Sequence, residues 1–332
     1  MNILLIGGPR FLGYALTEAL LAQNHSVTFF NRGKTNPDLF TGKVEKIIGN
    51  RDGEIANIGD KQFDAVIDTC GYVPRIVKQS VDFLKDKATY YVFISSISVY
   101  QDSTIINRDE SAPVIELEDK TTEDVMGKPQ NYGGLKVLCE RVVQDGFGSK
   151  AVIIRPGLIV GPRDPTNRFT YWPVRVRKGG KTLVPGDEPL KSQVVDVRDL
   201  AEFTIKLLED KKAGVYNVTG PGKPFDLKEL FQNLQKITHS DTKFVWASNE
   251  WLKKEQVGEW MEMPLWETSP ESQALMQVSI ARAIQDGLQF RTLEQTVTDT
   301  LAWYDDIQGD TKKWPAGLAP EKEKDLLGKL TA

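Results

Sequence analysis

Short apolar runs alternate with helix-compatible stretches along the first half of the chain. Residues 2–6 form a continuous apolar run, typical of a strand buried on both faces, and residues 11–24 carry apolar side chains at helical spacing. Further strands are predicted at residues 26–30, 44–48, 63–67, 90–94 and 151–154, and helices at 75–84 and 132–144. This alternation predicts βαβ units, so the expected fold class is α/β with a doubly wound parallel sheet.

The pattern loosens after Gly161. Gly, Pro and aromatic residues gather at residues 162–186, and the stretch 251–269 is rich in Trp, Met, Glu and Pro, which predicts an irregular wall for a substrate. Short strands are predicted at 194–197 and 216–218, and helices at 199–208, 226–237, 293–304 and 321–330. Asp226 suits the N-cap of its helix. We therefore expect a smaller C-terminal lobe beside the sheet.

A glycine-rich loop joins the first strand directly to a helix. Glycines there permit a tight turn and let the backbone approach a pyrophosphate, while the helix N-terminus offers free N–H groups. An ordinary strand-to-helix turn is the alternative, which the strand–loop–helix context disfavours. Arg10 takes the place of the middle glycine of the usual pattern, where a guanidinium suits a phosphate. The residues predicted to bind a dinucleotide are Gly7, Gly8, Arg10, Phe11, Leu12 and Gly13.

The second strand ends in a basic segment that carries Asn31, Arg32 and Lys34. A site for NAD usually has Asp or Glu at this point, which accepts a hydrogen bond from the ribose 2′-hydroxyl. The carboxylate is absent here and two cations stand close by, which favours NADP(H) and leaves NAD(H) as the alternative. A solvated basic loop would explain the same residues without any ligand.

Tyr132 and Lys136 stand four residues apart, on one face of a predicted helix. A nearby ammonium lowers the pKa of a phenol, normally about 10, and makes it an acid/base suited to neutral pH. This spacing alone is weak evidence, but hydroxyls also follow the fifth strand, at the edge where parallel sheets bind ligands. Ser96 would hydrogen-bond a substrate oxygen. Spacing does not choose among Ser95, Ser96 and Ser98, and serines also suit a turn.

Composition narrows the classes of protein that remain. The chain has 332 residues and a net charge of −4 with mixed signs, which argues against broad binding to nucleic acid. Two cysteines and two histidines form no metal-ligand cluster, so no metal site is expected. No apolar run is long enough to span a bilayer, and no signal-peptide pattern is present. We expect a cytoplasmic protein with a small-molecule substrate and no membrane partner.

Together these features resemble the extended short-chain dehydrogenase/reductases, also called the NAD-dependent epimerase/dehydratase family. The resemblance covers nearly the whole chain. It rests on the loop at residues 7–13, SSISVY at 95–100, YGGLK at 132–136, RPGLIVGP at 155–162 and QVVDVRDLA at 193–201. The loop GGPRFLG resembles that of an atypical branch that includes chloroplast stem-loop RNA-binding proteins. That RNA-binding branch lacks the catalytic tyrosine, so Tyr132 favours an enzyme.

The resemblance implies a Rossmann fold in three parts: residues 1–162 bind NAD(P), residues 163–308 complete the sheet and form the substrate lobe, and residues 309–332 are a polar tail. It implies Ser96 as the catalytic hydroxyl, Tyr132 as the acid/base and Lys136 as its partner. The further cofactor contacts that it implies are Asn50 and Arg51 beside the adenine, Asp68, Thr69 and Cys70 after the fourth strand, and Pro156 and Leu158 at the nicotinamide carboxamide. Helices at 75–84 and 132–144 correspond to those that pair across a homodimer interface in the family.

These observations favour an NADP(H)-dependent oxidoreductase that transfers a hydride to or from a carbonyl or alcohol carbon, with Tyr132 exchanging the proton. The Asp-Glu pair that sugar-nucleotide dehydratases carry after the catalytic hydroxyl is absent, because Ile97 and Ser98 stand there. Two alternatives stay open: a sugar-nucleotide epimerase with tightly bound NAD, and an RNA-binding or cofactor-sensing protein on the same fold.

Overall fold

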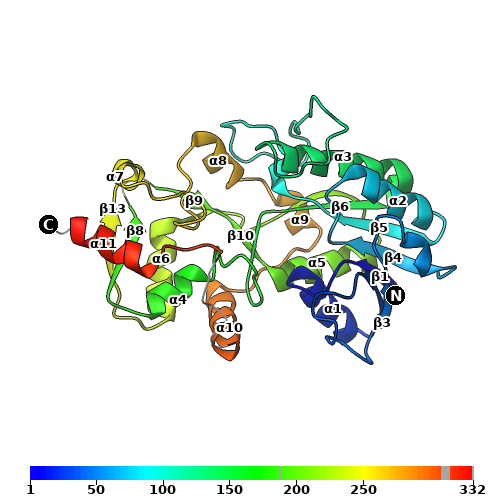
Figure 1. Ribbon diagram of the computed structural model, residues 1–332, viewed down its shortest axis with the longest axis horizontal. Helices are drawn as coiled ribbons and strands as arrows, with labels where there is room; N and C mark the ends of the chain where they lie inside the picture. Colours follow the sequence, from blue (N-terminus) through cyan, green and yellow to red (C-terminus); the bar gives the residue numbers. More distant parts are fainter. Residues whose placement is uncertain (187–188, 308–314, 331–332) are drawn as a thin grey trace.

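The first strand, β1 (Asn2–Ile6), lies inside a seven-stranded sheet with the strand order β11-β6-β5-β4-β1-β2-β3 (Figure 1). The computed structural model describes residues 1–186, 189–307 and 315–330. Every pairing in this sheet is parallel, which confirms the predicted doubly wound α/β fold. The other strands are β2 (Ser26–Asn31), β3 (Glu45–Ile48), β4 (Phe63–Asp68), β5 (Ala88–Ile94), β6 (Ala151–Pro156) and β11 (Gly214–Val218).

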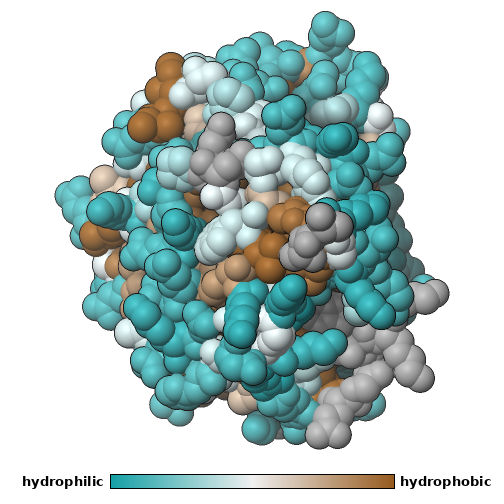
Figure 2. All heavy atoms as spheres, turned by 90° about the vertical axis from the view of Figure 1, so that its left-hand side faces the viewer, coloured by the Kyte–Doolittle hydropathy of each residue, from teal (hydrophilic) through white to brown (hydrophobic). Residues whose placement is uncertain are grey.

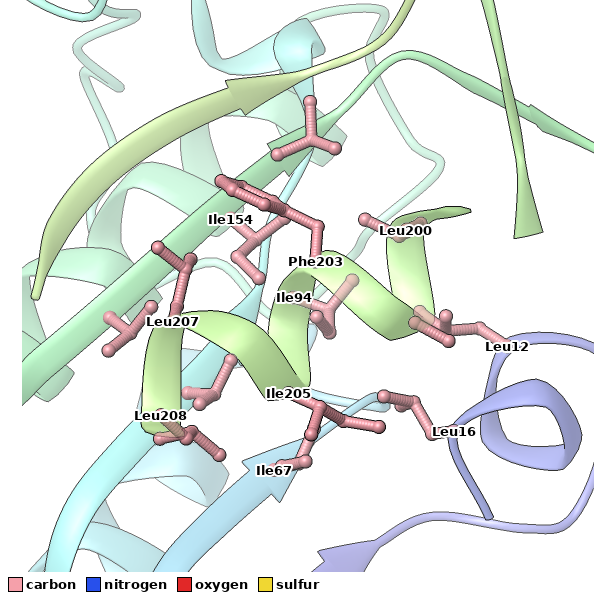
Figure 3. Packing of buried hydrophobic residues seen from close by; sticks show 14 of the residues in the cluster. Leu12, Leu16, Ile67, Ile94, Ile154, Leu200, Phe203, Ile205, Leu207 and Leu208 are labelled. Atoms are coloured by element: carbon pink, nitrogen blue, oxygen red, sulfur yellow. The ribbon is translucent and has the colours of Figure 1, made fainter. Parts of the chain in front are cut away.

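Helices cover both faces of this sheet (Figure 1). On one face α1 (Leu12–Ala22) packs beside α5 (Val197–Glu209), and on the other α2 (Pro74–Leu84) packs beside α3 (Asn131–Phe147). Figure 3 shows side chains of α5 gathered with those of α1 and of the strands in one buried cluster. Because both faces are covered, the strands need apolar side chains on both sides, which explains the continuous apolar runs.

The strand order reverses at β1, which pairs with β2 on one side and with β4 on the other. At such a point the connections leave the sheet in opposite directions, and a crevice opens at the carboxyl ends of the strands. The loop after β1 and the segment after β4 meet there, since Thr69 N donates to the carbonyl of Ile6 at 3.0 Å. The topology therefore places the predicted dinucleotide loop at the ligand-binding edge.

A second lobe follows, with an apolar core of its own that includes Trp172, Phe231 and Trp266. A parallel pair of strands, β8 (Lys181–Pro185) and β13 (Lys243–Ala247), forms its centre. Asp226 caps α6 as predicted, because its side chain accepts from Lys228 N. The helices of the C-terminal half are α4 (Tyr171–Arg177), α6 (Leu227–Ile237), α7 (Asn249–Lys254), α8 (Pro270–Leu275), α9 (Ala281–Gln285), α10 (Leu293–Asp306) and α11 (Pro320–Leu330).

Two short pairs of strands lie between the sheet and this lobe: β7 (Leu158–Val160) with β10 (Val194–Asp196), and β9 (Lys191–Ser192) with β12 (Phe225–Asp226). Short 3-10 turns occur at η1 (Ile55–Ile58), η2 (Ile97–Val99) and η3 (Gly148–Lys150). The predicted helix near the C-terminus is α11, which packs against β8 and buries Leu326. The face of the lobe turned away from the sheet is mostly hydrophilic, with apolar side chains gathered near its middle (Figure 2).

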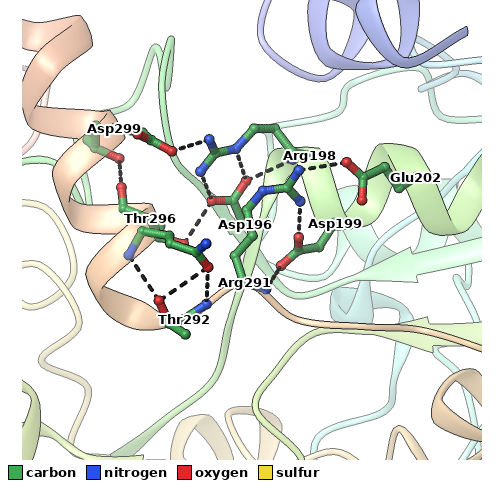
Figure 4. Close-up of polar contacts among 10 residues, drawn as sticks. Asp196, Arg198, Asp199, Glu202, Arg291, Thr292, Thr296 and Asp299 are labelled. Carbon is green, nitrogen blue, oxygen red and sulfur yellow. Dashed lines mark hydrogen bonds and ion pairs between the residues drawn. The ribbon is translucent and has the colours of Figure 1, made fainter. Parts of the chain in front are cut away.

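Ion pairs join the start of α5 to the segment around α10 (Figure 4). Arg198 bonds Asp196 and Asp299, while Arg291 bonds Asp199. These contacts join the QVVDVRDLA segment to residues about a hundred positions later in the chain, and so hold the start of α5 against the segment around α10. No helix of the described ranges has the length and apolar character that crossing a membrane requires.

Candidate active site

The loop after β1 has the backbone geometry that the sequence predicts. Gly7 has φ of 133°, and a Cβ there would lie 2.2 Å from the hydroxyl oxygen of Thr69. A Cβ at Gly13 would lie 2.3 Å from the carbonyl oxygen of Gly8, so both positions exclude a side chain. At Gly8 the nearest atom to such a Cβ is 3.9 Å away, which leaves open space above the backbone. The loop therefore fits close approach of a polyphosphate.

Two adjoining cavities extend from this loop. The β2-side cavity, of about 390 Å³, is lined by the ends of β2 and β3, and the β5-side cavity, of about 550 Å³, lies below the end of β5. Gly8, Cys70 and Tyr72 line both, so the two form one continuous cleft across the switch point. Such a cleft suits an elongated ligand with two ends, as a dinucleotide has.

The β2-side cavity holds the residues predicted for the adenosine end of the cofactor: Gly7, Asn31, Arg32, Lys34, Asn50 and Arg51. Asn31 shapes the site, because its side chain donates to the carbonyl of Gly7 at 3.0 Å and accepts from Gly33 N at 2.8 Å. Arg32 and Lys34 are exposed at the rim. A ligand in this cavity would meet two cations at the end of β2.

Asp68 is the exception among the predicted cofactor residues, because it lines neither cavity. Its side chain is fully buried and accepts from both terminal nitrogens of Arg51, at 2.7 and 2.8 Å, and from the Tyr91 hydroxyl at 2.9 Å. The direct cofactor contact predicted for Asp68 stays a prediction, and in this structure its carboxylate faces Arg51 and Tyr91. A buried carboxylate must be paired, and Asp68 orients Arg51 beneath the β2-side cavity.

The β5-side cavity brings together the predicted Ser96, Tyr132 and Lys136. It also holds the remaining predicted cofactor residues: Gly8, Arg10, Phe11, Leu12, Gly13, Thr69, Cys70, Pro156 and Leu158. Ser96 follows the end of β5, whereas Tyr132 and Lys136 lie on the first turns of α3. More than 30 residues separate the end of β5 from the start of α3. Tertiary packing therefore assembles one polar wall from separate segments.

The pKa of Tyr132 is raised, which corrects the expectation that Lys136 lowers it. Burial raises this pKa, and a hydrogen bond with Ser96 and the positive charge of Arg168 act against burial. Lys136 does not reach the phenol: its ammonium donates to the carbonyls of Gly71 and Ile94, each at 2.8 Å. Because its pKa is raised above the ordinary value for a phenol, Tyr132 is neutral at physiological pH.

Lys136 is almost completely buried between α3, β5 and the segment after β4. Burial lowers the pKa of Lys136 to about 8, because an ammonium loses its hydration inside the protein. Aromatic faces offset part of this cost, since its nitrogen lies 4.6 Å from the ring centre of Tyr72 and 4.9 Å from that of Phe93. The ammonium is thus fixed in place before any ligand binds.

The structure distinguishes the three serines that sequence spacing left equivalent. The Ser95 hydroxyl donates to buried Glu140 at 2.5 Å and so takes part in the interior of the domain. All three serines line the cavity, but the hydroxyl of Ser96 is the one that acts on the pKa of Tyr132, and it lies 3.1 Å from the hydroxyl of Ser98. Ser96 is therefore the hydroxyl placed to contact a ligand together with Tyr132.

The β5-side cavity also contains residues that the sequence did not single out. Arg168 and Asp164 come from the loop after β7, while Trp260 comes from the irregular stretch of the second lobe. That stretch is predicted to form a substrate wall, and its Trp260 lines this cavity. The signal for Arg168 was a cation in a Gly/Pro-rich segment that leaves the ligand-binding edge of the sheet. Among the described residues, no cluster of three His, Cys, Asp or Glu side chains could hold a metal ion.

Taken together, the switch-point cleft and its glycine loop define a nucleotide-binding protein with a Rossmann fold. The chain belongs to the NAD dependent epimerase/dehydratase family, whose family model matches residues 3–219. The matched range includes the glycine loop, the serines after β5, and both Tyr132 and Lys136.

Several solved structures share the fold. UDP-glucuronic acid 4-epimerase from Bacillus cereus, in complex with NAD, has a TM-score of 0.67 at 17% identity and covers 93% of this chain and 100% of its own. A putative epimerase from Burkholderia cenocepacia has a TM-score of 0.68 at 16% identity, with 91% and 97% covered. UDP-glucose 4-epimerase from Thermotoga maritima, with UDP-glucose, has a TM-score of 0.65 at 16% identity, with 93% and 100% covered.

A curated relative extends the comparison. The chloroplast stem-loop binding protein of 41 kDa b from Arabidopsis thaliana is 28% identical over an alignment of 236 residues, and the match covers 66% of this chain. The chain spans 58% of the length of that relative.

Proposed function

We propose that this protein is an NADP(H)-dependent oxidoreductase that acts on a carbonyl or alcohol carbon of a small molecule. The observation that carries the proposal is the meeting of Ser96, Tyr132 and Lys136 in a cavity continuous with the glycine-loop cleft. Open space in front of Gly8, and the exclusion of a Cβ at Gly7 and Gly13, support a pyrophosphate at this loop. When bound there, the nicotinamide would supply or accept the hydride.

The side chains of the β5-side cavity would handle the proton. Tyr132, whose phenol is neutral at physiological pH, would donate its hydroxyl proton to the carbonyl oxygen and recover it from water. Ser96, which lines the same cavity, would hold the same oxygen. Lys136 would stabilise negative charge on the phenolate when it forms and would offer donors to the cofactor ribose.

The residues at the end of β2 support NADP(H). Arg32 and Lys34 line the β2-side cavity, and Asn31 takes the position at which a carboxylate would bind a ribose 2′-hydroxyl. An additional phosphate on that ribose would gain two cations and meet no carboxylate at this strand end. NAD(H) stays the alternative.

Replacement of Tyr132 by phenylalanine tests the proposal. Oxidation of NADPH is first screened against panels of carbonyl compounds and nucleotide sugars, and the variant is then compared on each active compound. Loss of the acid/base should lower kcat by about 100-fold or more while the affinity for NADPH changes little. Tyr90→Phe is the matched control, because the Tyr90 hydroxyl bonds Lys150 outside both cavities. Full turnover by the Tyr132 variant would refute the assignment.

Sugar-nucleotide epimerisation with a retained cofactor is the second candidate. The family description and the names of the UDP-sugar epimerases with this fold favour it. Denaturation of the purified protein would release the bound nucleotide for identification by mass spectrometry. Stoichiometric NAD would favour the epimerase, whereas exchangeable NADP(H) would favour the oxidoreductase.

A further inference from the structure

Arg168 lies in the wall of the β5-side cavity, which Tyr132 also lines. It ends the loop between β7 and α4, and its charge acts on the phenol of Tyr132. The loop is locally fixed, because Asp164 accepts from both the backbone nitrogen and the hydroxyl of Thr166, at 2.8 and 2.7 Å. The guanidinium also stacks over the ring of Trp260, with 5.2 Å between its carbon and the ring centre. Arg168 is therefore held in place from both lobes.

The guanidinium of Arg168 has no hydrogen-bond acceptor among the residues that the structure describes. Burial lowers the pKa of Arg168, so the folded protein bears a desolvation cost that no close carboxylate offsets. Five other partly buried arginines donate directly to a carboxylate: Arg51, Arg155, Arg175, Arg198 and Arg291. Arg108, which is also buried, donates to the backbone carbonyl of Gln101 and lies outside the β5-side cavity. The five donors of a guanidinium match a carboxylate or a phosphate.

Asp164 is a second uncompensated group beside Arg168. It is 1% exposed, and its Oδ2 has no hydrogen-bond partner among the described residues. Its charge and that of Arg168 attract each other without a direct contact, and burial raises the pKa of Asp164. A raised folded pKa means that ionisation costs folding free energy at every pH above that pKa. The loop thus keeps a buried carboxylate and a free guanidinium that a purely structural loop would pair.

We infer that Arg168 binds an anionic group of the substrate, a carboxylate or a phosphate, and thereby sets the reacting carbon beside Tyr132. Asp164 lies on the same loop, and its charge attracts the guanidinium without occupying its donors. The inference deepens the proposed function and rests on it for the reaction, although anion binding by the loop does not depend on turnover. The substrate class is thus a small carbonyl or alcohol with a negative charge near the reacting carbon.

Anion titration of the full chain tests the site without any turnover. Malonate and inorganic phosphate are titrated separately by calorimetry, which tells a carboxylate from a phosphate preference. Arg168→Gln should weaken the preferred anion by about tenfold or more, the usual loss for a charge-assisted hydrogen bond. Arg163→Gln is the matched control, since Arg163 belongs to the same loop but stacks on Tyr14 outside the cavity. Unchanged binding of both anions in R168Q would overturn the inference.

Asp164→Asn should change the affinity for the anion in the opposite direction to Arg168→Gln. Removal of a negative charge beside the bound anion should tighten anion binding, whereas a merely structural residue would leave it unchanged or weaken it. The melting temperature should stay equal or rise, because asparagine keeps the acceptor for Thr166 and removes the cost of the buried charge. Weaker anion binding in a well-folded D164N would contradict the placement of Asp164.

Matched substrates separate this inference from the proposed function. On a keto acid and its amide, the wild type should show a higher kcat/KM for the acid, and R168Q should lose that preference through KM. If Tyr132→Phe keeps full turnover while R168Q loses anion affinity, the oxidoreductase assignment fails and the anion site stands. If Tyr132→Phe is inactive while R168Q binds the anions and prefers the keto acid as the wild type does, the anion site is refuted and the oxidoreductase assignment stands.

Discussion

The cations of the site differ in exposure, and this decides what each can do. Lys136 is buried, and burial lowers its pKa to about 8. Because two backbone carbonyls hold its ammonium, it occupies a fixed position in the cavity wall. Arg168 is half-buried, and its guanidinium has no acceptor in the described part of the chain, which suits a ligand anion. Arg32 is exposed at the end of β2, where it meets no desolvation cost and reaches only the rim of the cleft.

Arg32 should decide between the two nicotinamide cofactors. In Arg32→Glu the new carboxylate would repel a 2′-phosphate and accept a hydrogen bond from a 2′-hydroxyl, so preference should move from NADP(H) to NAD(H). A change of about tenfold or more in the ratio of the two affinities is expected from a charge-assisted contact. Fluorescence titration with NADPH and NADH measures it. Lys43→Glu, the same charge change on an exposed residue away from both cavities, should keep the original ratio.

At the scale of elements, α3 is attached to the sheet by a buried ion pair. Glu140 of α3 accepts from two nitrogens of Arg155 on β6, at 3.0 and 2.7 Å, and from the hydroxyl of Ser95. Arg155 also donates to the Tyr100 hydroxyl at 3.1 Å. Because Tyr132 and Lys136 lie on the first turns of α3, this pair sets the helix at the depth at which both line the cavity.

Glu140→Gln should therefore destabilise the protein strongly. The amide keeps the shape but leaves the guanidinium of Arg155 buried without a counter-charge, which costs about 3–5 kcal/mol of unfolding free energy. Glu116→Gln removes the exposed partner of Arg141 on the same helix and should cost no more than about 1 kcal/mol. Urea denaturation measures both. Equal losses of unfolding free energy in the two variants would show that the buried pair contributes no more than the exposed one. The double variant E140Q/R155M should recover stability, because it removes the unpaired guanidinium.

At the scale of the whole molecule, charge bears on the choice between an enzyme and an RNA-binding protein. The chain carries a net charge of −4, and its exposed cations are interspersed with carboxylates in many surface ion pairs. Binding to nucleic acid depends on the release of counterions by clustered Lys and Arg. The one curated relative described above is named for binding a stem-loop, yet it matches this chain over only part of its own length.

We expect no binding of stem-loop RNA at physiological salt. In a gel shift at about 150 mM salt, the protein should leave the RNA unshifted up to about 10 μM, a concentration within the usual range of non-specific dissociation constants. The Arabidopsis thaliana relative serves as the comparison in the same assay. A shift that weakens steeply as salt is raised would instead support the RNA-binding alternative.

Local features were readable from the sequence because short-range physics fixes them. The continuous apolar runs predict buried parallel strands, and the turn after β1 needs glycines whatever the rest of the chain does. The parallel pair β8 and β13 was not predicted, because two short strands separated by about sixty residues carry no local sign that they pair. Their pairing depends on the packing of the second core.

What the sequence by itself determined was the alternation of strands and helices in the seven-stranded sheet, the glycine loop and the presence of hydroxyl and amine side chains at or after the strand ends. Only the tertiary structure decided which partners those side chains take. Asp68 turns inward to Arg51, Ser95 to Glu140, and Lys136 to two backbone carbonyls, while Arg168 enters the cavity from a later loop. The physical reason is that a buried charge or hydroxyl must find its partner among neighbours brought close by folding, and sequence spacing does not encode those neighbours.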